Sequence, residues 1–160
     1  PGHQVTLGDD FTPSANMGFD RPGVVFTEKS YGDRDISEED DNRLLNELFH
    51  SDVVVTCSST IVIDAALFNK PMVGVALVRN PVGYWGGVEK FYYYEHFYNV
   101  VKTGGIKIAR KPDELLKFIA MYFREPELDR ESRKRIVREQ CYNLDGRASQ
   151  RVAEVIKKYV

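Results

Sequence analysis

The stretch DVVVTCSSTIVIDAALFNKPMVGVAL, residues 52–77, decides the fold of this chain. It begins with an apolar run at 52–57 that is rich in β-branched residues and hardly alternates, which is typical of a strand buried on both faces. Residues 61–68 have helical composition and end at Asn69-Lys70-Pro71, and residues 72–77 form a second strand of the buried type. Strand, helix and strand in this order predict a βαβ unit with a right-handed crossover and a parallel sheet.

Further elements extend this unit in both directions. Ser37 followed by Asp40 resembles a capping box, which begins a helix from Glu38 to His50. The other expected elements are a short strand at 24–26, a polar loop at 31–36, a Gly- and Pro-bearing loop at 79–87, an aromatic stretch at 91–98, a strand at 106–108, and helices near 112–122, 129–142 and 147–159. We expect an open, doubly wound, Rossmann-like parallel α/β sheet at residues 24–160, with a helical C-terminal tail and an irregular arm at 1–23.

Composition limits the classes of protein to which this chain can belong. A chain of 160 residues fits one soluble domain, and it holds neither a signal peptide nor an apolar run long enough for a membrane span. Cys57 and Cys141 lack metal-ligand spacing, so we expect reduced thiols, a cytoplasmic location and no bound metal. The chain begins at Pro1 without an initiator Met, which suggests a piece of a longer protein.

The net charge of −2 hides an asymmetry along the chain. Residues 28–52 carry nine acids and three bases, whereas residues 102–160 carry fifteen bases and nine acids. The basic end predicts either solvated helix faces or contact with an anionic partner, such as the inner face of a membrane. The aromatic stretch lacks flanking bases and any RNA-binding motif, so nucleic acid is not an expected partner.

Three consecutive hydroxyl residues, Ser58-Ser59-Thr60, stand between the first strand and its helix. Ligands of open parallel sheets bind outside the carboxyl ends of the strands, and the free N–H groups of a helix start attract phosphate. The same residue types also serve as ordinary N-caps. The turn therefore predicts a phosphate site, an N-cap, or both at once.

Asp64 lies four residues after Thr60 and hence on the same face of the predicted helix. A carboxylate within the otherwise apolar run 61–68 is unfavourable to bury without a partner. A ribose diol would satisfy it, and so would a nearby arginine or a set of backbone N–H groups. Both interpretations stay open on the sequence.

Two segments resemble a known family. Residues 51–71 are similar to the donor-site segment of GT-B transferases, in particular the CDP-glycerol glycerophosphotransferase-like and surface-polysaccharide glycosyltransferases. Residues 140–151, with Asp145-Gly146-Arg147-Ala148-Ser149 at their centre, resemble the ending of the same group. The resemblance covers about His50 to Tyr159, whereas the first 30 residues match poorly. The chain differs in having Cys57 where an aromatic residue is common, which leaves the choice between CDP- and UDP-linked donors open.

The resemblance implies roles for particular residues. It implies that Ser58, Ser59 and Thr60 hold the donor pyrophosphate and that Asp64 faces the ribose. It also implies that the acceptor site and the catalytic base belong to an N-terminal domain that precedes this half, so that the isolated half is inactive. No cofactor is expected beyond the nucleotide-activated sugar or polyol phosphate donor.

Two further residues are candidate donor contacts. His96, within the aromatic stretch, could donate to a phosphate or offset its charge, which also makes it the candidate catalytic residue, or it could simply pack. Arg147 could reach a phosphate across the cleft or form a local ion pair with Asp145. The main hypothesis is the donor-binding half of a transferase of surface polysaccharide or teichoic-acid-type synthesis. The alternatives are half of an isomerase similar to the sugar-nucleotide 2-epimerases, and a non-catalytic α/β interaction module.

Overall fold

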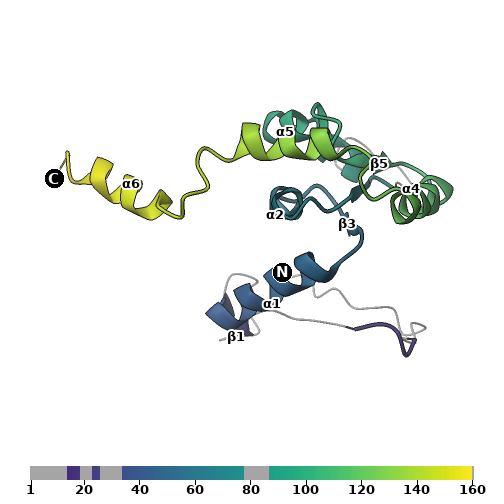
Figure 1. The fold of residues 1–160 in the computed structure, drawn as a ribbon, viewed down its shortest axis with the longest axis horizontal. Helices are drawn as coiled ribbons and strands as arrows, with labels where there is room; N and C mark the ends of the chain where they lie inside the picture. The colour runs from purple at the N-terminus through teal and green to yellow at the C-terminus, as the bar shows by residue number, and fades with distance from the viewer. Residues whose placement is uncertain (1–13, 19–22, 26–33, 78–86, 160) are drawn as a thin grey trace. The chain divides into compact units, whose positions relative to one another are not determined.

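The computed structural model describes residues 14–18, 23–25, 34–77 and 87–159 (Figure 1). The chain divides into two compact units, Pro1–Glu47 and Leu48–Val160. The arm expected at 1–23 is described only at 14–18 and 23, and the loop expected at 79–87 only at residue 87. Phe26, the last residue of the first expected strand, lies outside them as well.

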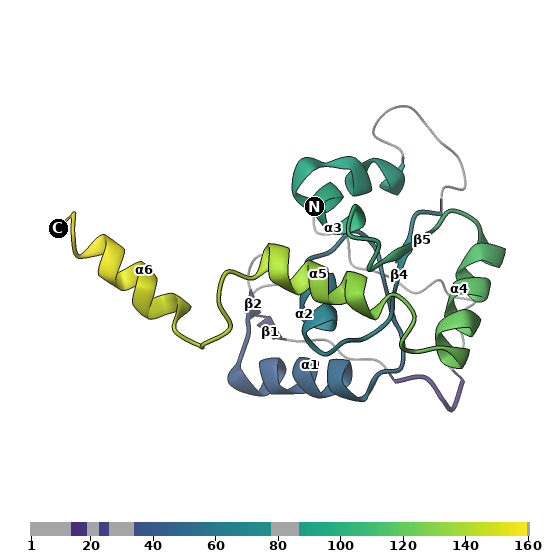
Figure 2. The same ribbon diagram turned by 45° about the horizontal axis from the view of Figure 1, so that its top comes forward.

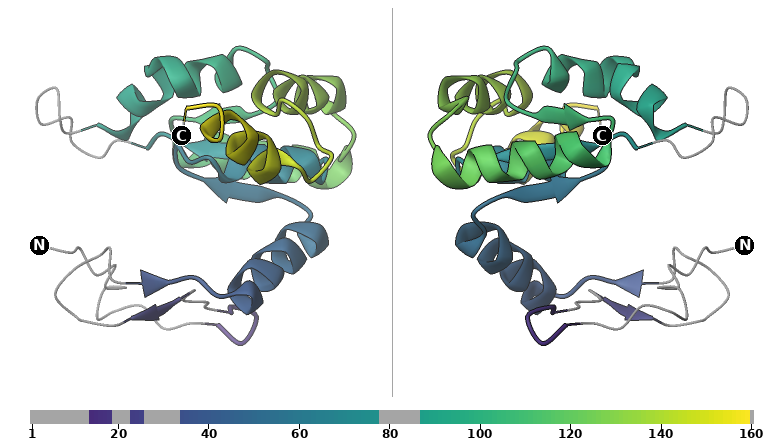
Figure 3. Two further views of the ribbon diagram at one scale, coloured as in Figure 1. Left: turned by 90° about the vertical axis from the view of Figure 1, so that its left-hand side faces the viewer. Right: turned by 90° about the vertical axis from the view of Figure 1, so that its right-hand side faces the viewer.

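The first unit contains a short antiparallel pair of strands. Strand β1 (Val24–Val25) pairs with β2 (Arg34–Asp35), and the two arrows lie side by side in Figure 3. Val24 lies opposite Asp35, and Val25 lies opposite Arg34. The strand expected from Val24 is thus confirmed over two residues, whereas the polar loop expected at 31–36 is wrong at Arg34 and Asp35, which find a partner strand.

Helix α1 (Glu38–His50) begins at the predicted capping box and has the predicted bounds. The Ser37 N–H and hydroxyl donate to Asp40 Oδ2 at 2.9 and 2.7 Å, and the Asp40 N–H donates to Ser37 Oγ at 3.2 Å. These bonds stabilise the ionised carboxylate and, with a smaller contribution from Arg43, lower the pKa of Asp40 to about 2. Two orphan N–H groups of the helix start are thereby satisfied reciprocally.

The second unit is built on a three-stranded parallel sheet with the order β3-β4-β5. Its strands are β3 (Val54–Thr56), β4 (Met72–Val75) and β5 (Lys107–Ala109), and α2 (Ile61–Leu67) connects the first two. The predicted βαβ unit and the open parallel α/β fold are confirmed. Central strand β4 is almost fully buried, as expected. The expectation that the first strand is buried on both faces is wrong for Val55, which is 45% exposed because β3 forms an edge of the sheet.

Helices cover both faces of this sheet. The remaining elements are the 3₁₀ helix η1 (Val88–Tyr93), α3 (Glu95–Val101), α4 (Pro112–Arg124), α5 (Arg130–Gln140) and α6 (Ala148–Ile156). One apolar cluster joins α2, α3, α5 and η1 on the face of Met72, and a second joins α4 to Val73 and Ala109 on the opposite face. In Figure 2, α2 and α5 accordingly lie on one side of the strands and α4 on the other. Successive side chains of β4 point to opposite faces of the sheet, so the strand packs against helices on both faces.

The last three predicted helices are present, and so is an unexpected helical pair. The apolar stripe predicted for 112–122 packs as expected, with Tyr122 buried and Leu115 and Ile119 against the second cluster. The aromatic stretch at 91–98, for which no helix was predicted, lies in η1 and α3. Helix α6 forms with its predicted apolar face, yet none of its residues is buried, and Val152 is 59% exposed.

Candidate functional site

The three parallel strands end at one edge of the sheet, and each is followed there by a different segment of the chain. Ser58-Ser59-Thr60, here called the serine turn, follows β3 and precedes α2. Ala76 follows β4, and Arg110 follows β5. Because this is the carboxyl edge of a parallel sheet, it is where an α/β protein of this kind places its ligand.

The serine turn leaves most of its donors unused by the described residues. Thr60 is already helical, with φ −63° and ψ −14°, and no side chain caps α2. The one contact of the cap type is a long bond of 3.4 Å, in which the Ile61 N–H donates to Ser59 Oγ. The backbone bonds of the turn use its carbonyls instead, as the Val62 N–H donates to Ser59 O at 3.3 Å and the Ile63 N–H to Thr60 O at 2.8 Å. Ser59 thus makes one long bond of the N-cap type, whereas Ser58 and Thr60 make none among the described residues, so the N-cap and phosphate-site interpretations both stay open.

Asp64 lies one turn into α2, with its side chain half-buried. It forms no ion pair within the described parts of the chain, so the predicted arginine partner is not found there. Burial raises the pKa of its carboxyl above the ordinary value. An acid that is partly desolvated and lacks a cationic partner, one turn from unused N–H donors, can accept hydrogen bonds from a ligand hydroxyl.

A tyrosine that sequence reasoning missed forms the other side of this edge. Tyr92 of η1 is 2% exposed, and its hydroxyl donates to the carbonyl of Val75 at 3.0 Å, where β4 ends. Gly74 makes room for this ring, since a Cβ atom there would lie 3.0 Å from Tyr92 Cε1 and 2.8 Å from Ile108 Cδ1. Burial raises the pKa of Tyr92 to about 12, with a smaller contribution from the negative charge that Cys57 can carry. A glycine within a buried strand was the signal that could have revealed a close approach at this position.

Arg110 joins η1 to the end of β5. Its Nε donates to Glu89 Oε1 at 2.6 Å and its second terminal nitrogen to the Tyr93 hydroxyl at 3.2 Å. The Arg110 N–H also donates to Glu114 Oε2 at 2.8 Å. The Glu89 and Tyr93 contacts raise the pKa of Arg110, so the guanidinium stays charged. The carboxyl edge thus carries fixed hydrogen-bonding groups at both β3 and β5.

The other two candidate residues lie on separate elements. His96 is exposed in the first turn of α3, with its ring centroid 6.2 Å from that of Tyr94. Arg147 precedes α6, and its N–H donates to Asp145 Oδ1 at 3.0 Å. Asp145 forms its ion pair with Arg151, at 2.7 Å, so the pair predicted for Arg147 is wrong. Among the described residues, no contact joins His96 or Arg147 to the serine turn.

A fully buried arginine supports the unit from the opposite end of α2. Arg133 of α5 is 0% exposed, and it donates to Asn69 Oδ1 at 3.0 Å, Pro126 O at 2.8 Å and Leu128 O at 2.5 Å. The bond to Asn69 holds the turn between α2 and β4, where Asn69 has a positive φ of 55°, and the other two bonds hold the connection between α4 and α5. Burial lowers the pKa of Arg133. Arg133 was not a predicted core or site residue, because a basic residue on a polar helix gives no sign in the sequence of being buried.

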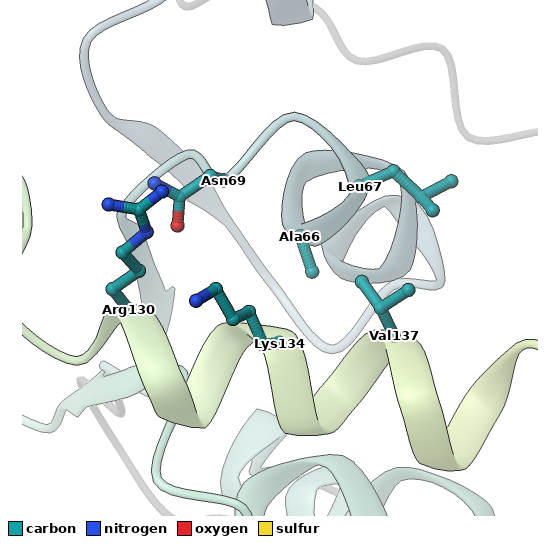
Figure 4. Close-up of a pocket in the computed structure, with 6 residues that line it drawn as sticks. All are labelled: Ala66, Leu67, Asn69, Arg130, Lys134 and Val137. Carbon is teal, nitrogen blue, oxygen red and sulfur yellow. The ribbon is translucent and has the colours of Figure 1, made fainter.

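A pocket of about 260 Å³ lies between α2 and α5, at the end of α2 away from the serine turn (Figure 4). Its two cations are engaged, since Arg130 pairs with Glu127 at 3.0 Å and Lys134 with Glu131 at 2.7 Å. In the described parts of the chain, no group of three His, Cys, Asp or Glu residues could hold a metal ion. No helix there is long and apolar enough to cross a membrane.

Comparison with known proteins gives one match. A family model described as CDP-Glycerol:Poly(glycerophosphate) glycerophosphotransferase matches residues 27–158. The matched region contains the serine turn, Asp64, His96 and Arg147, and it begins further toward the N-terminus than the resemblance seen in the sequence. Neither the curated proteins nor the solved structures contain a match to this chain.

Proposed function

The chain belongs to the CDP-glycerol:poly(glycerophosphate) glycerophosphotransferase family, and from that premise we propose that its second unit binds the nucleotide-activated donor of a teichoic-acid-type transferase. The observation that carries the proposal is the serine turn, whose N–H groups and hydroxyls are largely unused by the described residues. Its position at the carboxyl edge of a parallel sheet supports it. The same family membership favours the transferase over the isomerase and the non-catalytic module.

In the proposed complex, the donor pyrophosphate lies on the serine turn and the ribose reaches Asp64. The helix start supplies N–H donors and the positive end of its dipole to the phosphates. Asp64 accepts a hydrogen bond from a ribose hydroxyl, which replaces the solvation that its burial removes. A CDP-linked polyol is the donor that the family description favours, with a UDP-linked sugar as the other candidate.

The chemistry is the transfer of a polyol phosphate group. An acceptor hydroxyl attacks the distal phosphorus, the bond from that phosphorus to the bridging oxygen breaks, and the nucleoside monophosphate leaves with the negative charge. The serine turn stabilises this leaving group, because fixed N–H donors face the oxygen where charge develops. The acceptor hydroxyl gives its proton to a base that a preceding N-terminal domain would supply, and His96 and Arg147 are the remaining candidate donor contacts on this half.

The proposal places the reaction in the cytoplasm, at the inner face of the membrane. Cys57 and Cys141 are both free, as is usual for a reducing compartment. The exposed bases of α5, together with Lys157 and Lys158 just after α6, would favour an anionic surface.

A thermal-shift panel tests the binding step. CDP, UDP, CMP and pyrophosphate are added to the chain at increasing concentration, and each melting curve is recorded. A nucleotide present at 100 times its Kd should add about 2.7 kcal/mol of stability. Absence of a shift with every nucleotide would refute the proposed binding.

A transfer assay tests the proposal that this half alone does not catalyse transfer. The chain, supplied with a CDP-polyol and a polyol phosphate acceptor, should transfer nothing, because it lacks the acceptor-side base and the closure that excludes water. Turnover would show that this chain carries a complete active site.

A further inference from the structure

The C-terminal segment, residues 142–159, lies outside the core of the second unit. No residue of this segment belongs to either core cluster of the described chain, and every one except Arg151 is exposed. Its side-chain contacts are local, since Asp145 accepts from the Asn143 side chain at 3.1 Å and pairs with Arg151 at 2.7 Å. Packing of the core therefore does not account for the side chains of this segment.

Helix α6 nevertheless has a continuous apolar stripe. Its members follow at intervals of three and four residues and are each more than half exposed: Val152, Val155, Ile156 and Tyr159. Tyr159 belongs to the last turn, because its N–H donates to Ile156 O at 2.9 Å. Tyr142 and Leu144, before the helix, are 92% and 63% exposed. An exposed apolar surface of this kind marks a place where the protein meets a partner or a membrane.

Basic residues flank the stripe on both sides. With 3.6 residues per turn, Lys158 lies on one side of the stripe and Lys157 on the other, whereas Glu154 lies on the opposite face of the helix. Arg147 stands just before the helix. Within the described chain, no hydrogen bond or ion pair engages the side chains of these three bases. Their charges are therefore available to an anionic partner.

The charges decide between the surfaces that could cover the stripe. Pairing with α6 of a second copy, in either orientation, would bring bases of one helix next to bases of the other, which is unfavourable. A neutral apolar groove would make no use of the flanking charges. An anionic bilayer accepts both parts of the helix, because the stripe enters the boundary between head groups and acyl chains while the lysines contact the head groups. Tyr142 and Tyr159 are of the residue type that is enriched at this boundary.

Helix α5, the other basic helix, lacks the apolar part of such a surface. No large apolar side chain of α5, whose residues are all described, is exposed. Its bases Arg130, Lys134 and Arg135 are each paired with a nearby acid. Helix α5 can therefore add attraction to an anionic surface, but it has no side chains that would enter a bilayer.

We propose that α6 is an interfacial helix that lies in the surface of an anionic bilayer with its apolar stripe toward the acyl chains. The proposal rests on the membrane location proposed above and deepens it, because it names the segment that enters the bilayer and the charge of the lipid. With nine residues the helix is too short to span a bilayer, so it lies in the plane of the interface. The second unit is thereby held at the membrane through a segment that its own core does not use.

The test measures sedimentation of the chain with vesicles of two compositions, phosphatidylcholine alone and phosphatidylcholine mixed with phosphatidylglycerol. The mixed vesicles should bind the chain at least about tenfold more tightly, because each unpaired base near an anionic surface contributes about fivefold. Added salt should weaken this binding without abolishing it, since screening acts on the charges and not on the apolar stripe.

Variants assign the binding to α6. Ile156→Gln should weaken binding to the mixed vesicles by about fivefold to tenfold, because a half-exposed apolar side chain no longer enters the bilayer. Leu116→Gln is the matched control, since Leu116 of α4 is 67% exposed, and it should bind as the wild type does. Lys157→Gln should weaken binding by about fivefold and reduce its salt dependence, whereas Lys117→Gln at an exposed lysine of α4 should do neither. Melting curves should show that all four variants fold, since each replaced side chain is exposed.

Four results would overturn the proposal: no binding to either kind of vesicle, equal binding to both, equal losses in Ile156→Gln and Leu116→Gln, or a lipid-free dimer that Ile156→Gln dissociates in sedimentation velocity. CDP is titrated into the same proteins without lipid. Retained CDP binding without vesicle binding would count against the interfacial helix alone, and vesicle binding without CDP binding would count against the donor function alone.

Discussion

Replacing Asp64 by alanine should weaken the binding of a nucleoside diphosphate much more than the binding of pyrophosphate. Asp64 lies one helical turn beyond the serine turn, so it should meet the ribose while the phosphates lie on the turn itself. A hydrogen bond to a charged group contributes about 1.5–3 kcal/mol, which corresponds to about a 10- to 150-fold loss in affinity. Pyrophosphate has no ribose, and it should bind as well as before or slightly better once a nearby negative charge is removed.

The stability of the Asp64 variants provides an independent check. Burial raises the pKa of this carboxyl in the folded state, so the folded protein holds the proton more tightly than the unfolded chain. The associated stability is fully present below the unfolded pKa of about 4 and is lost as pH rises through the raised folded pKa. Asp64→Asn should remove this loss and make the unfolding free energy less dependent on pH in that range. An ion-paired aspartate would have a lowered pKa, and the stability that it contributes would be lost as pH falls instead of as pH rises.

Calorimetric titration of CDP and pyrophosphate into the wild type and Asp64→Ala, with a urea unfolding curve for each protein, measures both effects. Asp52→Ala is the matched control, because Asp52 is exposed just before β3, at the opposite end of that strand from the serine turn. It should change neither affinity. Equal losses for CDP and pyrophosphate, together with a loss of stability at neutral pH, would remove Asp64 from the ligand site.

Three further predictions concern the scaffold. Arg133→Met should destabilise the second unit by about 3–5 kcal/mol in chemical denaturation, because the bonds from a buried guanidinium to three part-buried acceptors are lost. Arg130→Met at an exposed ion pair should change stability by less than about 1 kcal/mol, and similar effects of both would contradict the packing described. Gly74→Ala should lower the free energy of unfolding by about 1–3 kcal/mol in the same denaturation experiment, since the added methyl would press on Tyr92. An unchanged denaturation midpoint would show that this ring is not held against β4. Helix α1 should lose stability on acidification. The stability that comes from the lowered pKa of Asp40 is present above the unfolded value of 3.8 and is lost as pH falls through about 2. Acid titrations followed by circular dichroism should show this loss in the wild type and not in Asp40→Asn, and identical acid transitions would count against the capping box.

The elements with strong local signals were predictable from the sequence. The capping box at Ser37 and Asp40 set the start of α1, and the β-branched runs on either side of the serine turn set the parallel sheet. These features are local, because capping and strand composition depend on neighbours in the chain. The edge position of β3, which exposes Val55, depends on which strands pair and is not encoded locally.

The site was predictable only in part. The position of the serine turn and of Asp64 on one helix follows from spacing alone. Two contacts hold η1 to the strand ends, Tyr92 with Val75 of β4 and Glu89 with Arg110 after β5, and their partners are 17 and 21 positions apart in the sequence. Arg133 was missed for the same reason, since its acceptor Asn69 is 64 positions away. Such contacts depend on tertiary packing, which overrides local pattern.

The most direct test of the central claim is a crystal structure of this chain with CDP bound. The account predicts phosphate oxygens within about 2.7–3.2 Å of the N–H groups and hydroxyls of Ser59 and Thr60, with a ribose hydroxyl at Asp64. Nucleotide density at another place on the chain, with none at the serine turn, would contradict it.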